Sequence, residues 1–407
     1  MFSVDNFYEF FNSCYGSKSK NIVPWIFRPH GSKNLAESFP LIEKHPHASM
    51  ELAELQISNA LIMHDQESFF HDHCMHIYRT DLLCNKKNPA WQEMTNEELF
   101  LQKWRTCSWP IFCHSEKNSK DIAWVEQTGC IPCYYFWHGL IARDWFRHWK
   151  HYNNLQNQST WQKRFLLYIR DCSGTRSYRS DIKNRLYELK DQIDTDWDRT
   201  RNLSSDFSAK ISMEDGQNTA IHLVAETLFD ESKIHVTEKV FKPMVMEQPF
   251  ILFSAPHTLE YLRNYGFRTF DHIWDESYDQ EKNPSVRMDK IINLIKKLCN
   301  KSNTEFQDII FHCREIIDHN KKYFFSDRFE EILLNELHYN MQIAIQEQQN
   351  RSVIDPGGSI FFVYDNIIKK NISISPHLKE DMRNIIAVMS TQYPKRYQLI
   401  KQKYPWC

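Results

Sequence analysis

The chain has 407 residues, of which 42% are hydrophobic and 14% aromatic, with 50 Lys and Arg against 52 Asp and Glu. This composition excludes a disordered chain, which would lack so many aromatic residues, and the formal net charge of -2 gives no overall signal for a polyanionic partner. The length predicts two or three domains.

The start of the chain, MFSVDNFYEFFNSCYG, lacks a basic segment followed by an apolar one, and no stretch approaches 18 uninterrupted apolar residues. We therefore expect a cytoplasmic protein that does not contact membranes. The 11 cysteines are then expected to be reduced, packed thiols. His71 to His76 (HDHCMH) and the pair Cys130 and Cys133 (CIPC) have metal-ligand or redox spacing, so structural zinc is the alternative; one CxxC alone is a weak zinc signal.

Short apolar runs recur through the first 155 residues, and each ends in polar residues. Runs of this kind predict strands that are buried on both faces of a mostly parallel sheet. The polar segment from Lys150 to Thr160 interrupts the pattern and predicts the end of an N-terminal Rossmann-like domain, residues 1–155. The runs are Asn21–Phe27, Asn59–Asp65, Trp109–Ser115 and Ile131–Gly139.

A second series of strands and helices begins at Arg164–Arg170 and continues through Ala220–Glu226 and Pro249–Ser254. It predicts a second Rossmann-like domain, residues 156–320, that faces the first across a cleft. Residues 321–407 are expected to form a helical segment that packs on both domains. In Asp327–Gln349, Ile332, Leu333, Leu337, Met341, Ile343 and Ile345 recur at roughly helical spacing, which is typical of packing.

The first candidate site follows the predicted strand Ala220–Glu226. Glu226 stands at its carboxyl end, Thr237 is placed to cap the next helix, and Glu238 lies in that helix's first turn. A helix start favours an anion, and Lys239 and Lys242 add positive charge there. This set would suit a diphosphate, while Glu226 or Glu238 could accept hydrogen bonds from sugar hydroxyls.

The second candidate site is IRDCSGTRSYRSD, between a predicted strand and a predicted helix. Gly174 permits a tight turn next to Thr175. Arg170, Arg176 and Arg179 lie close enough in sequence to bind one pair of phosphates. Neither the P-loop pattern nor the G-x-G-x-x-G fingerprint is present, which disfavours those nucleotide-binding classes.

The third candidate site is MHDQE, just past an apolar strand of the first domain. His64, Asp65 and Glu67 are candidates for a general base, and a solvated loop is the alternative. Two further segments are weaker. Asp194–Asp198 (DTDWD) has metal-binding spacing but reads better as an exposed acidic loop, and Trp137–Tyr152 reads better as a packed amphipathic helix than as a stacking surface.

The segment from Glu226 to Ser254, with VTEKVFKP at its centre, resembles the donor-binding signature of α1,3-fucosyltransferase-type glycosyltransferases. Thr227 and Leu228 stand where that family has Asn-Ser, which leaves the sugar open. The segments MHDQE, RDCSGTRSYR and LEYLRNYGFRTFDHIWDESYD are similar to those of glycosyltransferase-like proteins of tailed phages and large viruses. The resemblance covers roughly Ala60 to Asp279. It implies a GT-B fold, an inverting transfer without metal or other cofactor, Arg and Lys groups on the donor diphosphate, and a carboxylate base in the first domain.

The sequence thus predicts an enzyme that moves a hexose or pentose from a nucleotide-diphosphate sugar to a hydroxyl. A hydroxymethylated base in viral DNA is one acceptor that would fit, and the protein would then act in the host cytoplasm. A glycan or protein acceptor, and a non-catalytic nucleotide- or sugar-binding protein, are the alternatives.

Overall fold

The computed structural model describes the chain in segments. The first two, 22–27 and 59–64, are described as backbone strands only. The described residues are 22–27, 59–64, 109–127, 129–153, 161–169, 171–195, 211–229, 233–374 and 376–407.

The first sheet is parallel and runs in the order β1-β2-β3-β4 among the described residues. Its four strands fall within the four apolar runs of the first 155 residues, so that prediction is confirmed. The fourth strand is shorter than the predicted run Ile131–Gly139, because the chain leaves the sheet after Tyr134 and enters a helix at Trp137. The strands are β1 (Ile22–Phe27), β2 (Asn59–His64), β3 (Ile111–His114) and β4 (Ile131–Tyr134).

The second sheet is also parallel, and its order among the described residues is β6-β5-β7-β8. Its longest strand, β7 (Thr219–Ala225), is buried at every position, as expected for a strand with both faces covered. Strand β6 (Ile193–Thr195) was not predicted. It places Asp194 beside Leu166 in the sheet, so the exposed-loop interpretation of that residue is wrong. The other strands are β5 (Lys163–Leu167) and β8 (Phe250–Phe253).

Helices connect and cover the strands. We refer to the β1–β4 sheet with α7 and α8 as the first unit, and to the β5–β8 sheet with α9 to α13 as the second unit. The helices are α7 (Lys120–Gln127), α8 (Trp137–Trp145), α9 (Tyr178–Leu186), α10 (Met213–Asn218), α11 (Phe241–Met246), α12 (Thr258–Asn264) and α13 (Pro284–Cys299). Short 3₁₀ helices are η4 (Arg147–Trp149), η6 (Gly174–Arg176), η7 (Tyr187–Gln192), η9 (Glu238–Val240) and η10 (Ser277–Gln280).

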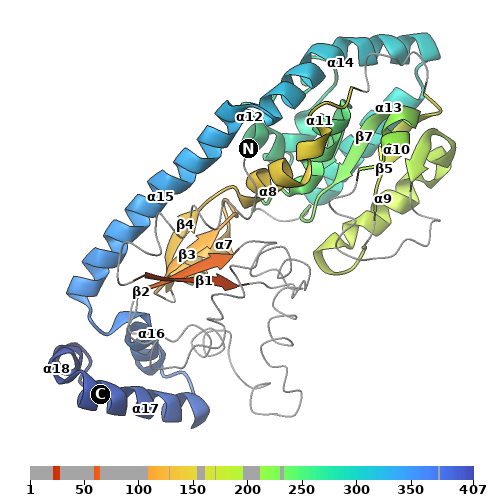
Figure 1. The fold of residues 1–407 in the computed structure, drawn as a ribbon. Helices are drawn as coiled ribbons and strands as arrows, with labels where there is room; N and C mark the ends of the chain where they lie inside the picture. Colours follow the sequence, from red (N-terminus) through yellow and green to blue (C-terminus); the bar gives the residue numbers. More distant parts are fainter. Residues whose placement is uncertain are drawn as a thin grey trace.

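The C-terminal part is helical, as predicted. Figure 1 shows α15 as a long helix along one side of the molecule, reaching from the second unit towards the last three helices. Its buried face includes Leu333, Leu337 and Met341 at helical spacing, whereas Ile343 is 53% exposed and does not pack as expected. These helices are α14 (Asn303–Phe324), α15 (Asp327–Ile354), α16 (Gly358–Lys369), α17 (Pro376–Gln392) and α18 (Pro394–Lys403).

One hydrophobic core runs through both units. Phe136, between β4 and α8, packs on Phe241 of α11 and on Tyr261 of α12, with ring centroids 6.0 and 5.2 Å apart. Buried residues of α15 belong to the same core, while α16 to α18 enclose a second one. The two sheets are therefore joined by shared apolar packing.

The fold class is confirmed at its coarse level: a mixed α/β protein with parallel sheets and a helical C-terminal part. The helix prediction for Trp137–Tyr152 is confirmed for its first part only: α8 buries Leu140 and Ile141 but ends at Trp145, and the 3₁₀ helix η4 follows. The division into residues 1–155, 156–320 and 321–407 stays a prediction. Within the described part of the chain, none of the helices combines the length and apolarity that crossing a membrane requires.

The start of α14 offers a direct test of local stability. Ser302 accepts a hydrogen bond from the Glu305 backbone N–H at 3.3 Å, and the Glu305 carboxylate accepts one from the Ser302 N–H at 2.8 Å. We expect Ser302→Ala to lower the free energy of unfolding by about 1 kcal/mol, measured by urea denaturation, because the first turn loses a cap. Ser390→Ala is the control. Its hydroxyl bonds back to the Ala387 carbonyl inside α17, so its loss should have little effect, and equal effects of both changes would contradict the capping role.

Candidate functional site

The second sheet has a topological switch point between β5 and β7. From β5 the chain crosses to β6 on one side, whereas β7 leads to β8 on the other. In open parallel sheets, ligands bind outside the carboxyl ends of strands at such a point, because the flanking loops separate there. The loop after β5 contains Gly174 to Arg176, and the segment after β7 begins with Glu226. Two of the three predicted sites thus flank one switch point.

Glu226 is the buried centre of the segment after β7, with 1% of its surface exposed. One carboxylate oxygen accepts a hydrogen bond from the Thr237 hydroxyl, and the other accepts from the Thr237 backbone N–H at 3.4 Å. Burial raises the pKa of Glu226 above its ordinary value, although Lys239 and the Thr237 hydroxyl act in the opposite direction. In this conformation Glu226 fixes Thr237; a contact between Glu226 and a sugar hydroxyl stays a prediction.

Thr237 caps η9, as the sequence predicts, and η9 leads directly into α11. The Thr237 hydroxyl accepts from both the backbone N–H and the Nζ of Lys239, at 3.5 and 3.1 Å. Lys239 Nζ also lies 3.2 Å from a Glu238 carboxylate oxygen, and the Lys239 side chain is 25% exposed. Burial alone would raise the pKa of Glu238, but Lys239, His138 and Lys242 lower it below the ordinary value. Glu238 is therefore held as a carboxylate beside a partly exposed ammonium.

The loop after β5 is bound to the end of β7. Gly174 has a φ of +55°, which few other residues would tolerate, and it opens η6. Thr175 Oγ1 donates to the Thr227 carbonyl at 3.4 Å. Arg176 is buried and pairs with Asp171 at 3.3 Å. These contacts bring the second predicted site against the first.

Arg179 binds carbonyl groups of the protein. Its Nη2 donates to the carbonyls of Ala225 and Glu226 at 2.9 and 2.8 Å, and its Nη1 donates to the Asp171 carbonyl at 3.0 Å. The neighbouring Tyr178 hydroxyl donates to the Glu226 carbonyl at 2.5 Å. Because carbonyls at the end of β7 occupy this guanidinium, Arg179 holds the two loops together, and its predicted contact with phosphate is untested.

Lys242 acts on Glu238 from within α11, since it helps to lower the pKa of that carboxylate. It is buried in α11, and its Nζ lies 5.7 Å from the centroid of the Tyr168 ring. Burial and the nearby Lys242 ammonium lower the pKa of His222, in the middle of β7, to about 3. Lys242 therefore lies against the sheet, and of the two predicted lysines Lys239 is the one with the larger exposed surface.

Some predicted residues cannot be placed. His64 ends β2 in register with Phe27, but its side chain lies outside the described part of the structure. Asp65, Glu67 and Arg170 also lie outside it, as does the HDHCMH segment.

The structure adds residues of the first unit that the sequence did not single out. Glu116 and Lys117, in the loop after β3, contact Lys233 and Ile234, which lead into Thr237. His138 of α8 packs edge-on against His235, with ring centroids 4.9 Å apart. The sequence held a signal for them, because HSEK stands at the end of an apolar run, as MHDQE does. The sequence did not indicate that the loop after β3 contacts the segment at Lys233 and Ile234, more than a hundred residues away.

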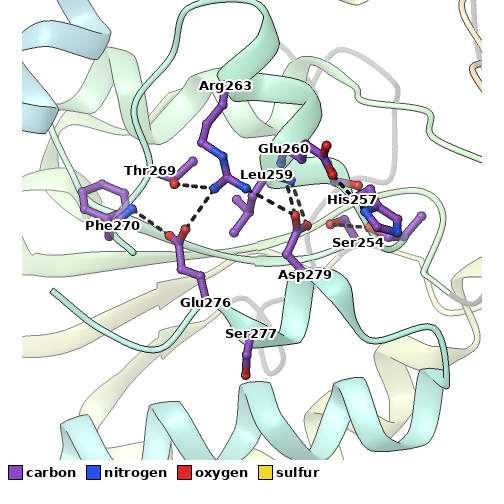
Figure 2. Close-up of polar contacts among 12 residues, drawn as sticks. Ser254, His257, Leu259, Glu260, Arg263, Thr269, Phe270, Glu276, Ser277 and Asp279 are labelled. Atoms are coloured by element: carbon purple, nitrogen blue, oxygen red, sulfur yellow. Dashed lines mark hydrogen bonds and ion pairs between the residues drawn. The ribbon is translucent and has the colours of Figure 1, made fainter. Parts of the chain in front are cut away.

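A second polar cluster lies beyond the end of β8 (Figure 2). Arg263 donates to Thr269 Oγ1 at 2.8 Å and to Glu276 at 3.4 Å, and Asp279 accepts the N–H groups of Leu259 and Glu260 at the start of α12. Both carboxylates are almost fully buried. The cluster binds the segment after α12 back onto the helix.

The cysteines of the CIPC segment are packed thiols. Cys130 and Cys133 are buried cysteines outside any disulfide, and Cys133 is the register partner of Cys113 on β3. Burial raises the pKa of Cys113 well above its ordinary value, and contact with Cys133 raises it further. Among the described residues, no group of three or more His, Cys, Asp or Glu side chains is arranged to hold a metal ion.

Comparison of the chain with models of protein families, with curated protein sequences and with solved structures found no match. The function is therefore inferred from the residues of the site.

The polar cluster of Figure 2 predicts a pH-dependent contribution to stability. Burial raises the pKa of Glu276 to about 7, although hydrogen bonds from Thr269 and Phe270 and the Arg263 charge oppose this. The folded protein then holds the proton more tightly than the unfolded chain does. This stability is present below the unfolded pKa of 4.5 and is lost as the pH rises through 7.

Glu276→Gln removes this titration. We expect the difference in unfolding free energy, wild type minus variant, to fall by up to about 3 kcal/mol between pH 4.5 and pH 8, measured by urea denaturation. Glu281→Gln is a control of opposite sign. The Asn283 N–H and Lys290 lower the pKa of Glu281, so its contribution is lost in acid. A Glu276 difference that rises with pH would contradict the assignment.

Proposed function

We propose that the chain is an inverting, metal-independent glycosyltransferase of the GT-B type, which moves a hexose or pentose from a nucleotide-diphosphate sugar to a hydroxyl. One observation carries the proposal: at the switch point of the second sheet, the loop of Arg176 bonds through Thr175 to Thr227, next to Glu226, and Glu226 binds Thr237 at the start of the Thr237–Glu238–Lys239 turn. The resemblance of these same segments to glycosyltransferase donor sites points in the same direction.

The departing diphosphate needs positive charge. Lys239 supplies it as a partly exposed cation at the cap of η9. Arg176 and Arg170 would add charge from the β5 loop. We assign Gly174, Thr175 and Arg179 to shaping this loop around the diphosphate, and Glu226, Glu238 and Lys242 to holding the turn in place.

The transfer is a direct displacement. A base takes the proton of the acceptor hydroxyl as its oxygen bonds to the anomeric carbon, and the bond from that carbon to the diphosphate breaks, leaving its electron pair on the departing oxygen. Attack from the opposite face inverts the anomeric centre.

Asp65 or Glu67, oriented by His64, is the proposed base. His64 is the last residue of β2, and Asp65 and Glu67 come after it in the chain; β2 pairs with β3, and the loop after β3 contacts the segment leading to Thr237. Because carboxyl ends of parallel strands share one edge, this edge of the first sheet faces the donor loop.

The proposal predicts that wild-type protein releases free nucleoside diphosphate from at least one member of a panel of nucleotide sugars, in the presence of a chelator. Lys239→Ala should reduce this turnover about 100-fold, because charge that stabilises the leaving diphosphate is lost, and Arg176→Ala should reduce it in the same direction. Lys190→Ala, at an exposed position on η7, is the matched control.

Melting temperatures of the variants show whether each one is folded. If Lys239→Ala and Arg176→Ala both turn over at the parent rate, the diphosphate assignment is wrong. Binding of a nucleotide sugar without any release would favour a non-catalytic binding protein.

The acceptor is tested separately. If it is a hydroxymethylated base, the protein has to bind DNA and extrude the base, and phosphate contacts make that binding salt-dependent. We then expect retention on a DNA column at about 50 mM salt, and steep release by about 200 mM. No retention at low salt would leave glycan or protein hydroxyls as the acceptor.

A further inference from the structure

The segment that leads into the Thr237 cap is bonded to the first unit. The Lys117 N–H donates to the Ile234 carbonyl at 3.0 Å, and the Ile234 N–H donates to the Lys117 carbonyl at 2.9 Å. This antiparallel bridge lies outside both sheets. It joins the loop after β3 to a position only three residues before Thr237.

Buried side chains reinforce the bridge. Lys233 Nζ lies 3.8 Å from a Glu116 carboxylate oxygen, and these side chains are 8% and 3% exposed. Solvent screens such a pair weakly, so the charges attract more strongly than on the surface. On the other side of Ile234, His235 packs against His138 of α8. Both neighbours of the bridged residue therefore contact the first unit.

The Lys117 side chain contacts residues of three elements, β4, α12 and α15. Its Nζ lies 4.3 Å from the centroid of the Tyr134 ring and 5.3 Å from those of Tyr261 and Tyr265. A Glu336 carboxylate oxygen of α15 lies 3.5 Å from the same nitrogen. Cation–π and ionic attraction thus hold the residue whose backbone binds Ile234.

We propose that Glu116, Lys117, Lys233 and Ile234, termed the inter-unit clamp, are positioning residues for the donor site. Resting on the proposed function, this inference adds that the diphosphate site is not a property of the second unit alone. The first unit sets the path of the segment that delivers Thr237 to Glu226, and through Thr237 it sets the position of Lys239. When the clamp is broken, Lys239 no longer meets the diphosphate in the productive geometry.

The test uses full-length protein and the variants Glu116→Gln, Lys233→Met and their double. We expect each single change to raise the donor KM about tenfold or more while kcat falls less, because a displaced contact weakens donor binding. The double variant should be no worse than the worse single, since both changes break one interaction. Glu330→Gln is the matched control, because it removes the 2.7 Å ion pair between α8 and α15 and leaves the clamp intact.

A loss of kcat with unchanged donor KM in Glu116→Gln would place Glu116 in the chemistry and overturn the positioning role. Additive effects of the two single changes would overturn it too. General destabilisation would lower the active fraction without moving KM, and Glu330→Gln measures how large that loss is.

Amide hydrogen exchange without any ligand separates this inference from the proposed function. Breaking the clamp should speed exchange at Ile234, Thr237 and Lys239, whose N–H groups bond to Lys117, Glu226 and Thr237, while β7 stays protected. Unchanged exchange in Glu116→Gln and Lys233→Met would overturn the clamp even if the protein transfers sugar. Faster exchange in a protein that binds none of GDP, UDP, ADP or CDP would instead uphold the clamp and refute the proposed function.

Discussion

A carboxylate buried at the end of β7 is the constraint on which the site depends. Glu226 is 1% exposed, and a buried carboxylate is costly unless donors surround it. Both of its oxygens accept from Thr237, so the chain has to return to the strand end 11 residues later. That return starts η9 at the carboxyl edge of the sheet, and it brings Glu238 and Lys239 with it. The position of the turn is therefore set by hydrogen bonding more than by the helix that follows.

Burial divides the cations of this region into two kinds. Arg179 is bound to carbonyls at the end of β7, and the buried Arg287 of α13 is bound to those of Phe229, Ser254 and Glu281. These guanidinium groups donate to carbonyls at and beyond the strand ends, and so they order the loops. Lys239 keeps a partly exposed ammonium. In the fold, the buried arginines therefore order the loops, and the ammonium of Lys239 stays accessible to a ligand.

The two units are joined by both apolar and polar contacts. Phe136 packs against α11 and α12, and the Lys117 ammonium lies near tyrosine rings of both units and a glutamate of α15. Such extensive contacts favour small adjustments of loops over wide separation of the two sheets. The helical C-terminal part contributes to this, since α15 packs against α8 and β4 of the first unit and against α14.

The sequence by itself determined the described strands other than β6, and it determined the cap of η9. Strands covered on both faces have to be continuous apolar runs, and Thr237 caps η9 through atoms only two residues away. It did not determine β6, where Ile193 is the single apolar residue and pairing with β5 makes the strand. Nor did it determine the carbonyls at the end of β7 to which Arg179 donates, which lie 46 and 47 residues away. The backbone hydrogen bonds between Lys117 and Ile234 were not determined either. Local sequence patterns indicate secondary-structure propensity and which residues are apolar enough to be buried. Contacts between distant segments form only once the sheets have packed. In this protein, those contacts decide which charged side chains are buried and which stay exposed.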